Sequence, residues 1–512
     1  MGPASSSSQR LSRRQVLQAG LAGSAGFAVA ACGSTVRRAA SVPAAGSDLE
    51  AVRHVVFLML ENRSFDHLFG SYRGVRGFDD AGNRAAFSQR WPGGAAPDGR
   101  LLPFHLDTAT HDASCTWDLT HNWGPQHACW DHGAMDRFVA THIAPANEGP
   151  VHGPLTMGYY TRADLPFLYA LADAFTICDR YHCSVLGPTH PNRLFAVSAT
   201  NDPGGTAGGP VLVTSSLLSA QFSARWTSMP EVLEDAGVSW KVYDPAGAQY
   251  QPGNPASMLI SDNIMLYFSA AEDPASPLHQ KAFGPIYPSD FAADVASGQL
   301  PSVSWIIPAL GHDGHPPAPM QPAEALVDQV LSTLVANPEL WASTVLFVTF
   351  DENDGFFDHV PPPVPPAGTA GEYVTVSPLP AAAAGVAGPI GLGMRVPMLV
   401  VSPFSRGGYV CSDVFDHTSQ LRFLETRFGT KVPNLSEWRR RSTGDLSAAV
   451  STAGRDTTVP SLPSTPDPSP VVKAQCTAMQ LLELESPMGA YPISFPQRMP
   501  TQEPGTARRR RR

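Results

Sequence analysis

Two nearly continuous apolar runs that end in polar residues are the clearest pattern along the chain. They are His54–Leu60, followed by Glu61-Asn62, and Thr344–Phe350, followed by Asp351-Glu352. Apolar runs without alternation are typical of strands that are buried on both faces of a parallel sheet. Ligands of such sheets bind beyond the carboxyl ends of the strands, so we expect these polar residues to meet at one edge.

The first of these runs also allows a different interpretation. Asn62 or Ser64 can serve as the N-cap of a helix that continues through Leu68. The pattern of residues 54–70 alone does not decide between a strand that presents ligands and a helix that follows a cap.

Helical and strand-like segments alternate through the rest of the chain. Apolar spacing predicts helices over residues 164–174, 229–236, 323–340 and up to 428, and further strands at 238–243, 302–307 and 397–402. Such alternation is typical of an α/β fold with a mostly parallel sheet and helices on both faces. Glycine- and proline-rich stretches indicate large loop insertions.

A Gly-Pro turn precedes Thr189, and Pro191 follows it closely. This order predicts a helix that begins just after Thr189, with proline in its first turn. The free N–H groups and the dipole of a helix N-terminus favour a phosphate and stabilise an ionised hydroxyl. Thr189 is therefore a candidate nucleophile. The alternative from the same motif is that Thr189 is only an N-cap.

Histidines also follow a predicted strand. His312 and His315 come shortly after the strand at residues 302–307, and residues 110–138 are rich in His and Trp without regular periodicity. We interpret the latter segment as a loop region that lines a site. Together with the acidic strand ends and Thr189, these side chains indicate metal-assisted phosphoryl transfer, in which oxygen ligands hold a divalent ion and a histidine serves the leaving group.

Composition and charge narrow the class of protein. Of 512 residues, 43% are hydrophobic and 16% are charged, so the chain can bury a large core. The formal net charge of -10 argues against nucleic acid as a partner, because phosphate backbones are bound by clustered Lys and Arg.

The N-terminus resembles an export signal. Residues 12–17 form a twin-arginine motif, and residues 19–31 form an apolar region that is too short to span a membrane. The sequence therefore predicts export of the folded protein by the twin-arginine machinery. Cys32 follows a sequence similar to a lipoprotein signal-peptidase site and would be lipidated, although residues 28–30 also fit ordinary cleavage.

The chain divides into a signal, a tether, a domain and a tail. Residues 1–31 are the signal peptide, 32–50 a flexible tether, 51–450 the catalytic domain and 451–512 a Pro- and Ser-rich tail that we expect to be disordered. A lipidated Cys32 would hold the domain at the cell envelope, on the outer face of the cytoplasmic membrane. Without lipidation the protein would be secreted.

Cysteine usage is consistent with an exported protein. Setting Cys32 aside leaves six of the seven cysteines, an even number that permits disulfides. The pairs that are close in sequence are Cys115 with Cys129 and Cys178 with Cys183, and the other two cysteines are Cys411 and Cys476. Six cysteines allow many pairings, and the sequence does not choose among them. Zinc binding by these thiols is the weaker interpretation, because no paired C-x-x-C spacing occurs.

Four segments resemble one known family. They are ENRSFDHLFG at residues 61–70, GPTHPNR at 187–193, FDENDGFFDHV at 350–360 and SPFSRGGYVCSDVFDHTSQLRFLE at 402–425. These motifs are similar to those of the bacterial phosphoesterase family of phosphatidylcholine-type phospholipases C and a related acid phosphatase. The resemblance spans residues 53–445 and implies an alkaline-phosphatase-like α/β core.

The resemblance also implies roles for individual residues. The ligands of one divalent metal ion would be Glu61, Asn62, Thr189, Asp351 and Glu352, with Thr189 as the nucleophile. The residues at the phosphate or leaving group would be His121, His315 and His417. The family relationship implies zinc, whereas three carboxylates suit calcium, magnesium or manganese, so the identity of the ion stays open.

The activity that the resemblance implies is that of a phospholipase C. Such an enzyme hydrolyses phosphatidylcholine-type phospholipids at a membrane surface to diacylglycerol and a phosphorylated headgroup, here through a phospho-threonine intermediate. The related acid phosphatase, which has Ser in place of Thr189 and Asp in place of Glu352, makes a phosphomonoesterase the alternative. A non-catalytic surface lipoprotein that binds a ligand is the third hypothesis.

Aromatic residues close to His121 in the sequence are candidates for headgroup binding. They are Trp117, Trp123, Trp130 and Tyr159. Quaternary ammonium groups such as choline are held against aromatic faces. The alternative of equal weight is that these rings pack the loop region onto the sheet.

Overall fold

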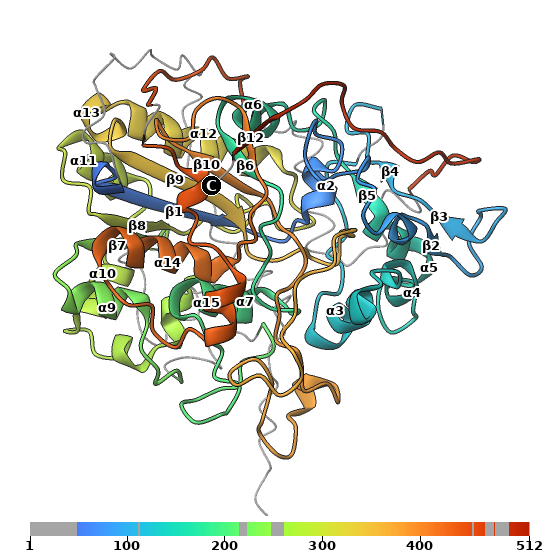
Figure 1. Ribbon diagram of the computed structural model, residues 1–512, viewed down its shortest axis with the longest axis horizontal. Coiled ribbons are helices and arrows are strands. Elements are labelled where there is room, and N and C mark those ends of the chain that lie inside the picture. Colours follow the sequence, from blue (N-terminus) through green and yellow to red (C-terminus); the bar gives the residue numbers. More distant parts are fainter. Residues whose placement is uncertain are drawn as a thin grey trace, which may run out of the picture.

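An eight-stranded sheet forms the centre of the computed structural model (Figure 1). Its strands follow the order β12-β11-β6-β10-β9-β1-β8-β7. Their bounds are β1 His54–Leu60, β6 Thr176–Cys178, β7 Trp240–Tyr243, β8 Val303–Ile306, β9 Thr344–Phe350, β10 Met398–Val401, β11 Tyr409–Cys411 and β12 Arg508–Arg510. β10 is antiparallel to both neighbours, and the other described pairs of this sheet are parallel. The predicted mostly parallel α/β sheet is confirmed.

The structure describes most of the chain beyond its N-terminal region. The described residues are 49–110, 113–214, 223–246, 261–452, 455–465, 476 and 491–510. The twin-arginine motif, Cys32 and most of the predicted tether lie outside them.

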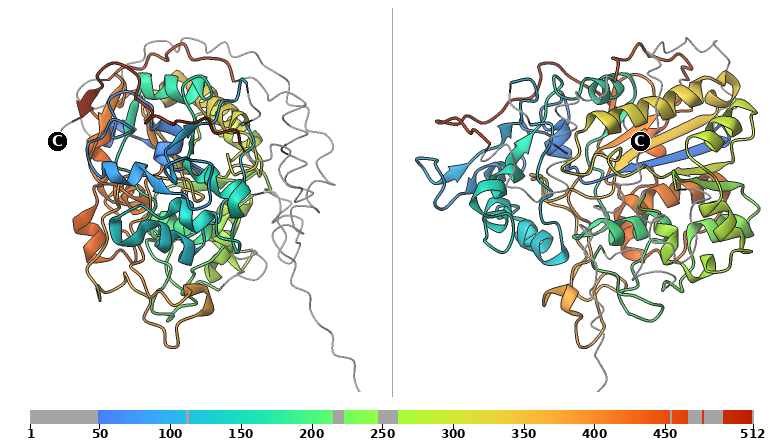
Figure 2. Two further views of the ribbon diagram at one scale, coloured as in Figure 1. Left: turned by 90° about the vertical axis from the view of Figure 1, so that its right-hand side faces the viewer. Right: turned by 180° about the vertical axis from the view of Figure 1, so that it is seen from behind.

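Helices cover both faces of the sheet, as the sequence predicts. In Figures 1 and 2, α6 and α12 lie on one face, and α7 and α14 lie on the other. The bounds of the described α-helices are α2 Phe65–Phe69, α3 Trp123–Trp130, α4 Phe138–His142, α5 Gly149–His152, α6 Pro166–Ala174, α7 Thr189–Ser198, α9 Met229–Asp235, α10 Pro277–Phe283, α11 Ser289–Ala296, α12 Gln321–Val335, α13 Pro338–Trp341, α14 His417–Phe428 and α15 Glu437–Ser442. Within the described part of the chain, none of these helices is both long and apolar enough to cross a membrane.

The opening motif contains both elements that its pattern allows. β1 ends at Leu60, and Ser64 then caps α2 by accepting a hydrogen bond from the His67 N–H at 3.1 Å. Residues 61–63 therefore form the short link between the end of a buried strand and the start of a helix, which is where the strand interpretation places the ligands.

One predicted helix is two helices in the structure. The apolar spacing of residues 323–340 continues through the break, but α12 ends at Val335 and α13 begins at Pro338. Proline has no N–H for a helical hydrogen bond and fits the first position of a new helix. Asn337 caps that helix by accepting a hydrogen bond from Leu340 N at 3.2 Å.

A loop-rich insertion between α2 and α6 lies to one side of the sheet, at the right of Figure 1. It contains α3, α4, α5 and two small sheets, formed by β2 Gln89–Arg90 with β3 Arg100–Leu101 and by β4 Phe104–His105 with β5 Gly158–Tyr159. Residues 110–138, which we expected to lack regular structure, include helix α3. The predicted loop insertion is thus present, with more helix than its sequence pattern indicates.

Residues 491–510 of the C-terminal tail are ordered, whereas the sequence predicts disorder. β12 pairs with β11, the ring of Tyr491 stacks on Phe104 with centroids 5.5 Å apart, and Glu503 forms an ion pair with Arg162 at 2.7 Å. The prediction is wrong for residues 491–510. Strand pairing and aromatic contacts with distant parts of the chain supply the order, and composition cannot reveal such contacts.

The disulfide also differs from the pairs that are close in sequence. Cys115 is bonded to Cys476, with a sequence separation of 361 residues and a Cα–Cα distance of 5.4 Å. In the part of the chain that the structure describes, the free cysteines are Cys129, Cys178, Cys183 and Cys411, and all of them are buried. Pairing of Cys115 with Cys129 and of Cys178 with Cys183 is therefore excluded, because disulfides depend on spatial geometry that sequence distance does not set.

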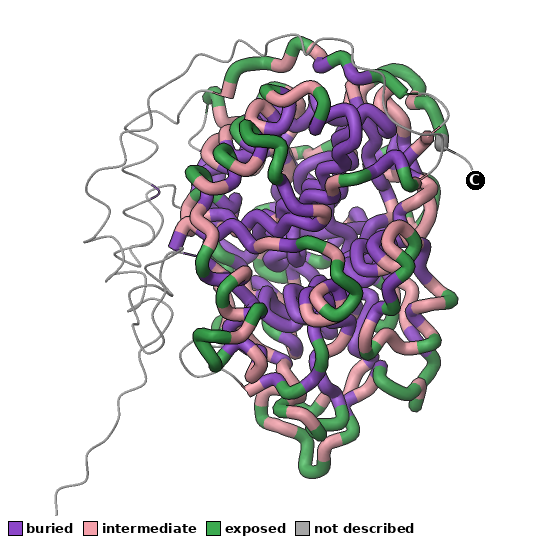
Figure 3. The backbone as a smooth tube through the Cα atoms, turned by 90° about the vertical axis from the view of Figure 1, so that its left-hand side faces the viewer, coloured by how far each residue is buried: buried purple, intermediate pink, exposed green. Residues whose placement is uncertain are grey.

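The two longest strands form the buried centre of the core. All residues of β9 are buried, and most of β1 is buried as well, in keeping with the dense interior in Figure 3. β1 pairs with β9 residue by residue, from His54 opposite Thr344 to Leu60 opposite Phe350. Both strands therefore end at the same level.

A buried carboxyl group joins the helices on one face of the sheet. Glu324, in the first turn of α12, is 4% exposed and accepts a hydrogen bond from the Leu168 N–H at 3.0 Å. Leu168 lies in the first turn of α6, where backbone N–H groups lack partners within the helix. Glu324 therefore caps α6 from a neighbouring helix. Burial raises its pKa to about 8.

Substitution of Glu324 by Gln should change the pH dependence of stability. A glutamate in the unfolded chain titrates at about 4.3, so the unfolded chain loses a proton at a lower pH than the folded protein does. The free energy of unfolding of the wild type therefore falls as pH rises between these two pKa values. Gln keeps the acceptor for Leu168 but does not ionise. We expect the Tm of the variant relative to wild type to rise by several degrees between about pH 5 and about pH 8 in thermal denaturation. An equal Tm difference at both pH values would contradict this assignment.

Candidate active site

The register of β1 and β9 brings two acidic residues together. Leu60 lies opposite Phe350, so Glu61 and Asp351 leave adjacent strands at the same level. The Asn62 N–H donates to Asp351 Oδ1 at 3.1 Å, which closes the two strand ends. Glu61 is 1% exposed and Asp351 is fully buried. The predicted meeting of carboxylates at one edge of the sheet is therefore what the structure shows.

The residues that follow form a tight network around these ends. Asn62 has a φ of 62° and donates from Nδ2 to Asp354 Oδ1 at 2.9 Å. Glu352 Oε2 accepts a hydrogen bond from the Asp354 N–H at 2.6 Å. Gly355 then has a φ of 111°, and a Cβ atom there would lie 2.6 Å from the His142 ring. Only glycine fits this turn, which aims the acidic residues inward.

Helix α7 carries the candidate nucleophile to the same place. Thr189 is its first residue and is fully buried, and Pro188 occupies the N-cap position. Arg193 is one helical turn later, so it shares a face with Thr189. Its Nη2 donates to Glu61 Oε1 at 2.9 Å and its Nε to Asp351 Oδ2 at 3.2 Å. The helix start predicted at Thr189 is confirmed, and the N-cap alternative is not realised.

The loop after β8 adds a histidine. Asp313 O accepts a hydrogen bond from the Glu61 N–H at 2.8 Å, and Asp313 Oδ1 accepts one from the His315 N–H at 3.0 Å. His315 Nε2 lies 3.9 Å from Glu61 Oε2. The structure therefore places His315 beside the carboxylates, while His312 lies three residues earlier in the same loop.

His121 comes to the site from the loop-rich insertion. Its Nδ1 donates to Leu119 O at 2.7 Å and lies 3.3 Å from Asp354 Oδ1, and its Nε2 lies 3.6 Å from Glu352 Oε1. The Leu119 N–H donates to Asp354 Oδ2 at 3.2 Å, which fixes the loop to the strand end. This contact between segments far apart in sequence brings His121 beside the carboxylates. The family resemblance implies that His121 lies in this site, at the phosphate or leaving group.

His417 is held by protein contacts at both ring nitrogens. Nε2 donates to Asp351 O at 2.6 Å, and Nδ1 accepts a hydrogen bond from Tyr181 OH at 3.0 Å. Burial lowers the pKa of His417 to about 4, so the ring is neutral, as these two bonds require. We therefore interpret His417 as a residue that positions Asp351, in place of the catalytic role that the resemblance implies.

The electrostatics of the site are dominated by buried negative charge. Burial, together with neighbouring carboxylates, raises the pKa of Glu61 and of Glu352 well above its usual value, and Arg193 acts in the opposite direction on Glu61. Burial alone would lower the pKa of His121, but the carboxylates of Glu352 and Asp354 outweigh it and raise that pKa well above the usual value.

Comparison with known proteins decides the family. The sequence profile of the Phosphoesterase family matches residues 52–431. The chain belongs to the phosphoesterase family. It is accordingly a phosphoric ester hydrolase, as its motifs imply.

Individual relatives of this phosphoesterase are named as phospholipases C. Phospholipase C A of Mycobacterium tuberculosis is 43% identical over 501 residues, which cover 94% of each chain. Non-hemolytic phospholipase C of Burkholderia pseudomallei is 41% identical over 481 residues, which cover 88% of this chain and 66% of that protein. A solved structure of a protein in the alkaline phosphatase superfamily from Vibrio parahaemolyticus is 9% identical, covering 55% of this chain and 63% of that one with a TM-score of 0.28.

Oxygen atoms suited to a cation gather at the site of this phosphoesterase. Within the described part of the chain, the following atoms are buried and have no hydrogen-bond partner: Asn62 Oδ1, Thr189 Oγ1, Asp313 Oδ2 and Glu352 Oε1. Buried polar atoms without partners are rare, and a missing ion is one reason for them. A site made mainly of oxygen ligands fits a hard or borderline divalent cation.

Among the described residues, two further groups of side chains have spacing suited to a metal ion. Ligand atoms of Asp118, His121 and Asp354 lie within 4.8 Å of one another, next to the strand ends. The other group, Asp66, Asp358 and His359, is joined by Arg395, whose nitrogens lie 2.8 Å from Asp66 and 2.9 Å from Asp358. The Arg395 guanidinium already neutralises that group, so only the first belongs to the candidate active site.

Two of the four aromatic residues proposed for headgroup binding lie in the core. Trp123 is fully buried and donates from Nε1 to Val386 O at 3.0 Å, and Trp130 is 7% exposed. For these two residues the packing alternative describes the structure, and the substrate-binding prediction is corrected. Tyr159 is half-buried and packs against Phe78 with centroids 4.7 Å apart.

Trp117 is the aromatic residue of this set that lies on the loop of His121. It is half-buried, lies next to Asp118, and stacks on His152 with centroids 4.2 Å apart. A headgroup role for Trp117 stays a prediction.

Several residues of the site were not singled out from the sequence. Arg193 lies inside the motif at 187–193, and its spacing of four residues from Thr189 on one helix could have identified it. Asp313 and Asp354 adjoin predicted site residues. Asp262 contributes to the raised pKa of Glu61, but no strand end or motif in the sequence marks it.

Proposed function

We propose that this phosphoesterase is a phospholipase C that acts on phosphatidylcholine-type lipids through Thr189. The observation that carries the proposal is the placement of the buried Thr189 hydroxyl, which has no hydrogen-bond partner among the described residues and lies at the start of the helix whose Arg193 binds Glu61 and Asp351. The names of the relatives support phosphodiester lipids as the substrates.

The proposed reaction has two displacements at phosphorus. Thr189 Oγ loses its proton to a neighbouring carboxylate and forms a bond to phosphorus as the bond from phosphorus to the diacylglycerol oxygen breaks, and a histidine gives a proton to that oxygen. His121 lies by Glu352 and His315 lies by Glu61, so both are candidates for this proton. A water molecule then attacks the phosphorus and gives a proton to that histidine as the bond from phosphorus to Thr189 Oγ breaks. Thr189 takes a proton back from the carboxylate, and the phosphorylated headgroup is released. A bound divalent cation would lower the pKa of the Thr189 hydroxyl and offset charge on the phosphate.

The residues that would hold this cation are those whose oxygen atoms converge. They are Glu61, Asn62, Thr189, Asp351 and Glu352, with Asp313 as a further candidate. Among the described residues, the basic side chains in ion-pair contact with Glu61, Asp351 and Glu352 are Arg193, His121 and His315. The excess of negative charge supports one divalent ion and does not distinguish calcium, magnesium, manganese and zinc.

The substrate and nucleophile can be tested together. We expect wild type to release headgroup and diacylglycerol from phosphatidylcholine faster than from phosphatidylglycerol, and to hydrolyse a simple phosphomonoester more slowly. Thr189→Ala should reduce turnover of each substrate on the order of a thousandfold or more, because it removes the attacking atom. Released products are measured at equal substrate concentrations.

The matched control is Thr333→Ala, which removes a hydroxyl on α12 that bonds only within its own helix, to Gln329 O at 2.8 Å. It should turn over each substrate at the wild-type rate. Equal rates for wild type and Thr189→Ala would remove Thr189 from the mechanism. A wide preference for the monoester would favour a phosphatase, and absence of turnover with all substrates would favour a binding protein.

Removal of the metal should abolish activity and lower stability. Exhaustive chelation would leave the buried carboxylates without the cation that offsets their repulsion, so we expect loss of turnover and a lower Tm, both restored by one divalent ion. Asp351→Asn should resemble the chelated enzyme, and its Tm should respond little to the chelator. Full turnover by metal-stripped protein would contradict the proposal.

We also propose that the enzyme is exported and held at the cell envelope. The support is the twin-arginine motif and the lipidation-type site at Cys32. Replacing Arg13 and Arg14 by Lys should retain the protein in the cytoplasm, because the route reads the guanidinium pair. Cys32→Ala should be exported but released from the membrane fraction, as detected by immunoblotting of cell fractions. Membrane retention of Cys32→Ala equal to wild type would show that Cys32 is not the anchor.

A further inference from the structure

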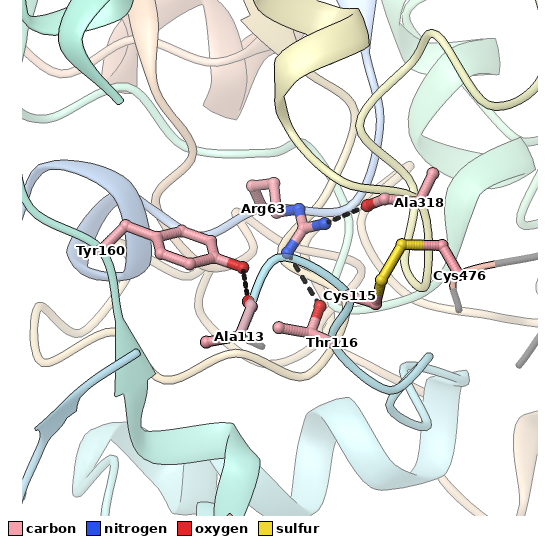
Figure 4. The surroundings of a disulfide bond; sticks show 7 residues. All are labelled: Arg63, Ala113, Cys115, Thr116, Tyr160, Ala318 and Cys476. Atoms are coloured by element: carbon pink, nitrogen blue, oxygen red, sulfur yellow. Dashed lines mark hydrogen bonds between the residues drawn. A yellow bond between two sulfur atoms is a disulfide. The ribbon is translucent and has the colours of Figure 1, made fainter. Parts of the chain in front are cut away.

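Arg63 is a fully buried guanidinium that contacts three segments around the site. Its Nε donates to Gly314 O at 2.8 Å and its Nη2 to Ala318 O at 3.3 Å, while its Nη1 donates to Thr116 Oγ1 at 3.1 Å. Figure 4 shows the side chain reaching Ala318 on one side and Thr116 on the other. Its own N–H donates to Glu352 O at 2.9 Å.

On one side, Arg63 forms hydrogen bonds with the loop that carries His315. Gly314 and Ala318, whose carbonyls accept from the guanidinium, bracket His315 and the two prolines after it. Two donors from one planar group to both ends of a five-residue loop leave little freedom for the residues between them. The position of His315 beside Glu61 thus depends on Arg63.

On the other side, Arg63 contacts the loop that leads to His121. Thr116 is held by the guanidinium, and its neighbour Cys115 is bonded to Cys476 of the tail. Tyr160 OH donates to Ala113 O at 2.7 Å at the start of the same loop (Figure 4). The loop is therefore fixed at residues 113, 115 and 116, shortly before Leu119 and His121 reach Asp354.

The chemistry of this contact set is unusual for a buried charge. Among the described residues, the hydrogen-bond acceptors of the guanidinium are carbonyls, a hydroxyl and the His67 ring, and none is a carboxylate. Burial lowers the pKa of Arg63, while Asp354 and Asp313 favour its charge from a distance. A buried cation without a bonded carboxylate carries a large desolvation penalty. The guanidinium therefore forms no direct ion pair. It holds two loops by hydrogen bonds and offsets the negative charge of the site at longer range.

We propose that Arg63 is a positioning residue that sets the placement of His121 and His315 relative to the carboxylates, with the Cys115–Cys476 disulfide holding the His121 loop against it. This inference rests on the proposed function for the roles of the two histidines. The guanidinium acts through these loops and does not touch the substrate.

Arg63→Lys keeps the charge but cannot reach both loops, so it separates charge from geometry. We expect kcat for a chromogenic phosphodiester to fall roughly 10- to 100-fold with KM little changed, since small misplacements of catalytic groups have effects of this size. Assays are run well below the Tm of each variant. The matched control is Arg395→Lys, another fully buried arginine, which bonds Asp66 and Asp358 outside the site. It should lower Tm but leave kcat unchanged.

Amide hydrogen exchange tests the positioning without turnover. Arg63→Lys should increase exchange in both residues 113–121 and residues 311–318, relative to wild type. The double variant Cys115→Ala/Cys476→Ala should increase exchange only in the first segment and lower kcat less than Arg63→Lys does.

Wild-type kcat in Arg63→Lys, or unchanged exchange in both loops, would overturn the inference. An equal fall of kcat in Arg63→Lys and Arg395→Lys would do so as well, because it would indicate a general effect of losing a buried guanidinium. If wild type itself hydrolyses no phosphodiester, the proposed function fails, and hydrogen exchange still decides whether Arg63 positions the loops.

Discussion

The concentration of buried carboxylates at the carboxyl ends of parallel strands is the constraint on which the rest of the structure depends. The group comprises Glu61, Asp313, Asp351, Glu352 and Asp354. Like charges in a dry site repel, and each must be compensated or remain protonated. Helix α7 supplies Arg193, which contacts the carboxylates directly, and the insertion supplies His121. Arg63 interacts with Asp354 and Asp313 at longer range. Segments from distant parts of the sequence thus meet at one group of buried negative charges, which their basic side chains offset.

Much of the fold follows from apolar patterning. The runs at His54–Leu60 and Thr344–Phe350 are long, and they lie side by side at the centre of the sheet, so periodicity is a strong signal there. Parallel strands share the direction of their ends, which is why the prediction that Glu61 and Asp351 meet was correct. The helix start at Thr189 could be predicted because its signals are local, namely the Gly-Pro turn before it and Pro191 in its first turn.

Other features depend on contacts that no local pattern records. The strand at Met398–Val401 has the same apolar character as the parallel strands of the sheet. It is nevertheless antiparallel to both of its neighbours, since the direction of a strand depends on the path of the preceding chain. Trp123 and Trp117 are the same residue type and lie close in the sequence. Only the structure shows that Trp123 is a core ring and that Trp117 lies on the loop of His121. Cys476 is bonded to Cys115 although the two are 361 residues apart in the sequence.

The C-terminal strand has a consequence for behaviour in concentrated solution. β12 covers the edge of β11 and ends the sheet with Arg508 and Arg509 exposed. Open strand edges template pairing with other chains, and clustered charge on the last strand opposes it. The formal net charge of the protein is -10, so this edge carries charge of the opposite sign, and like charges on two such edges oppose edge-to-edge pairing of two copies.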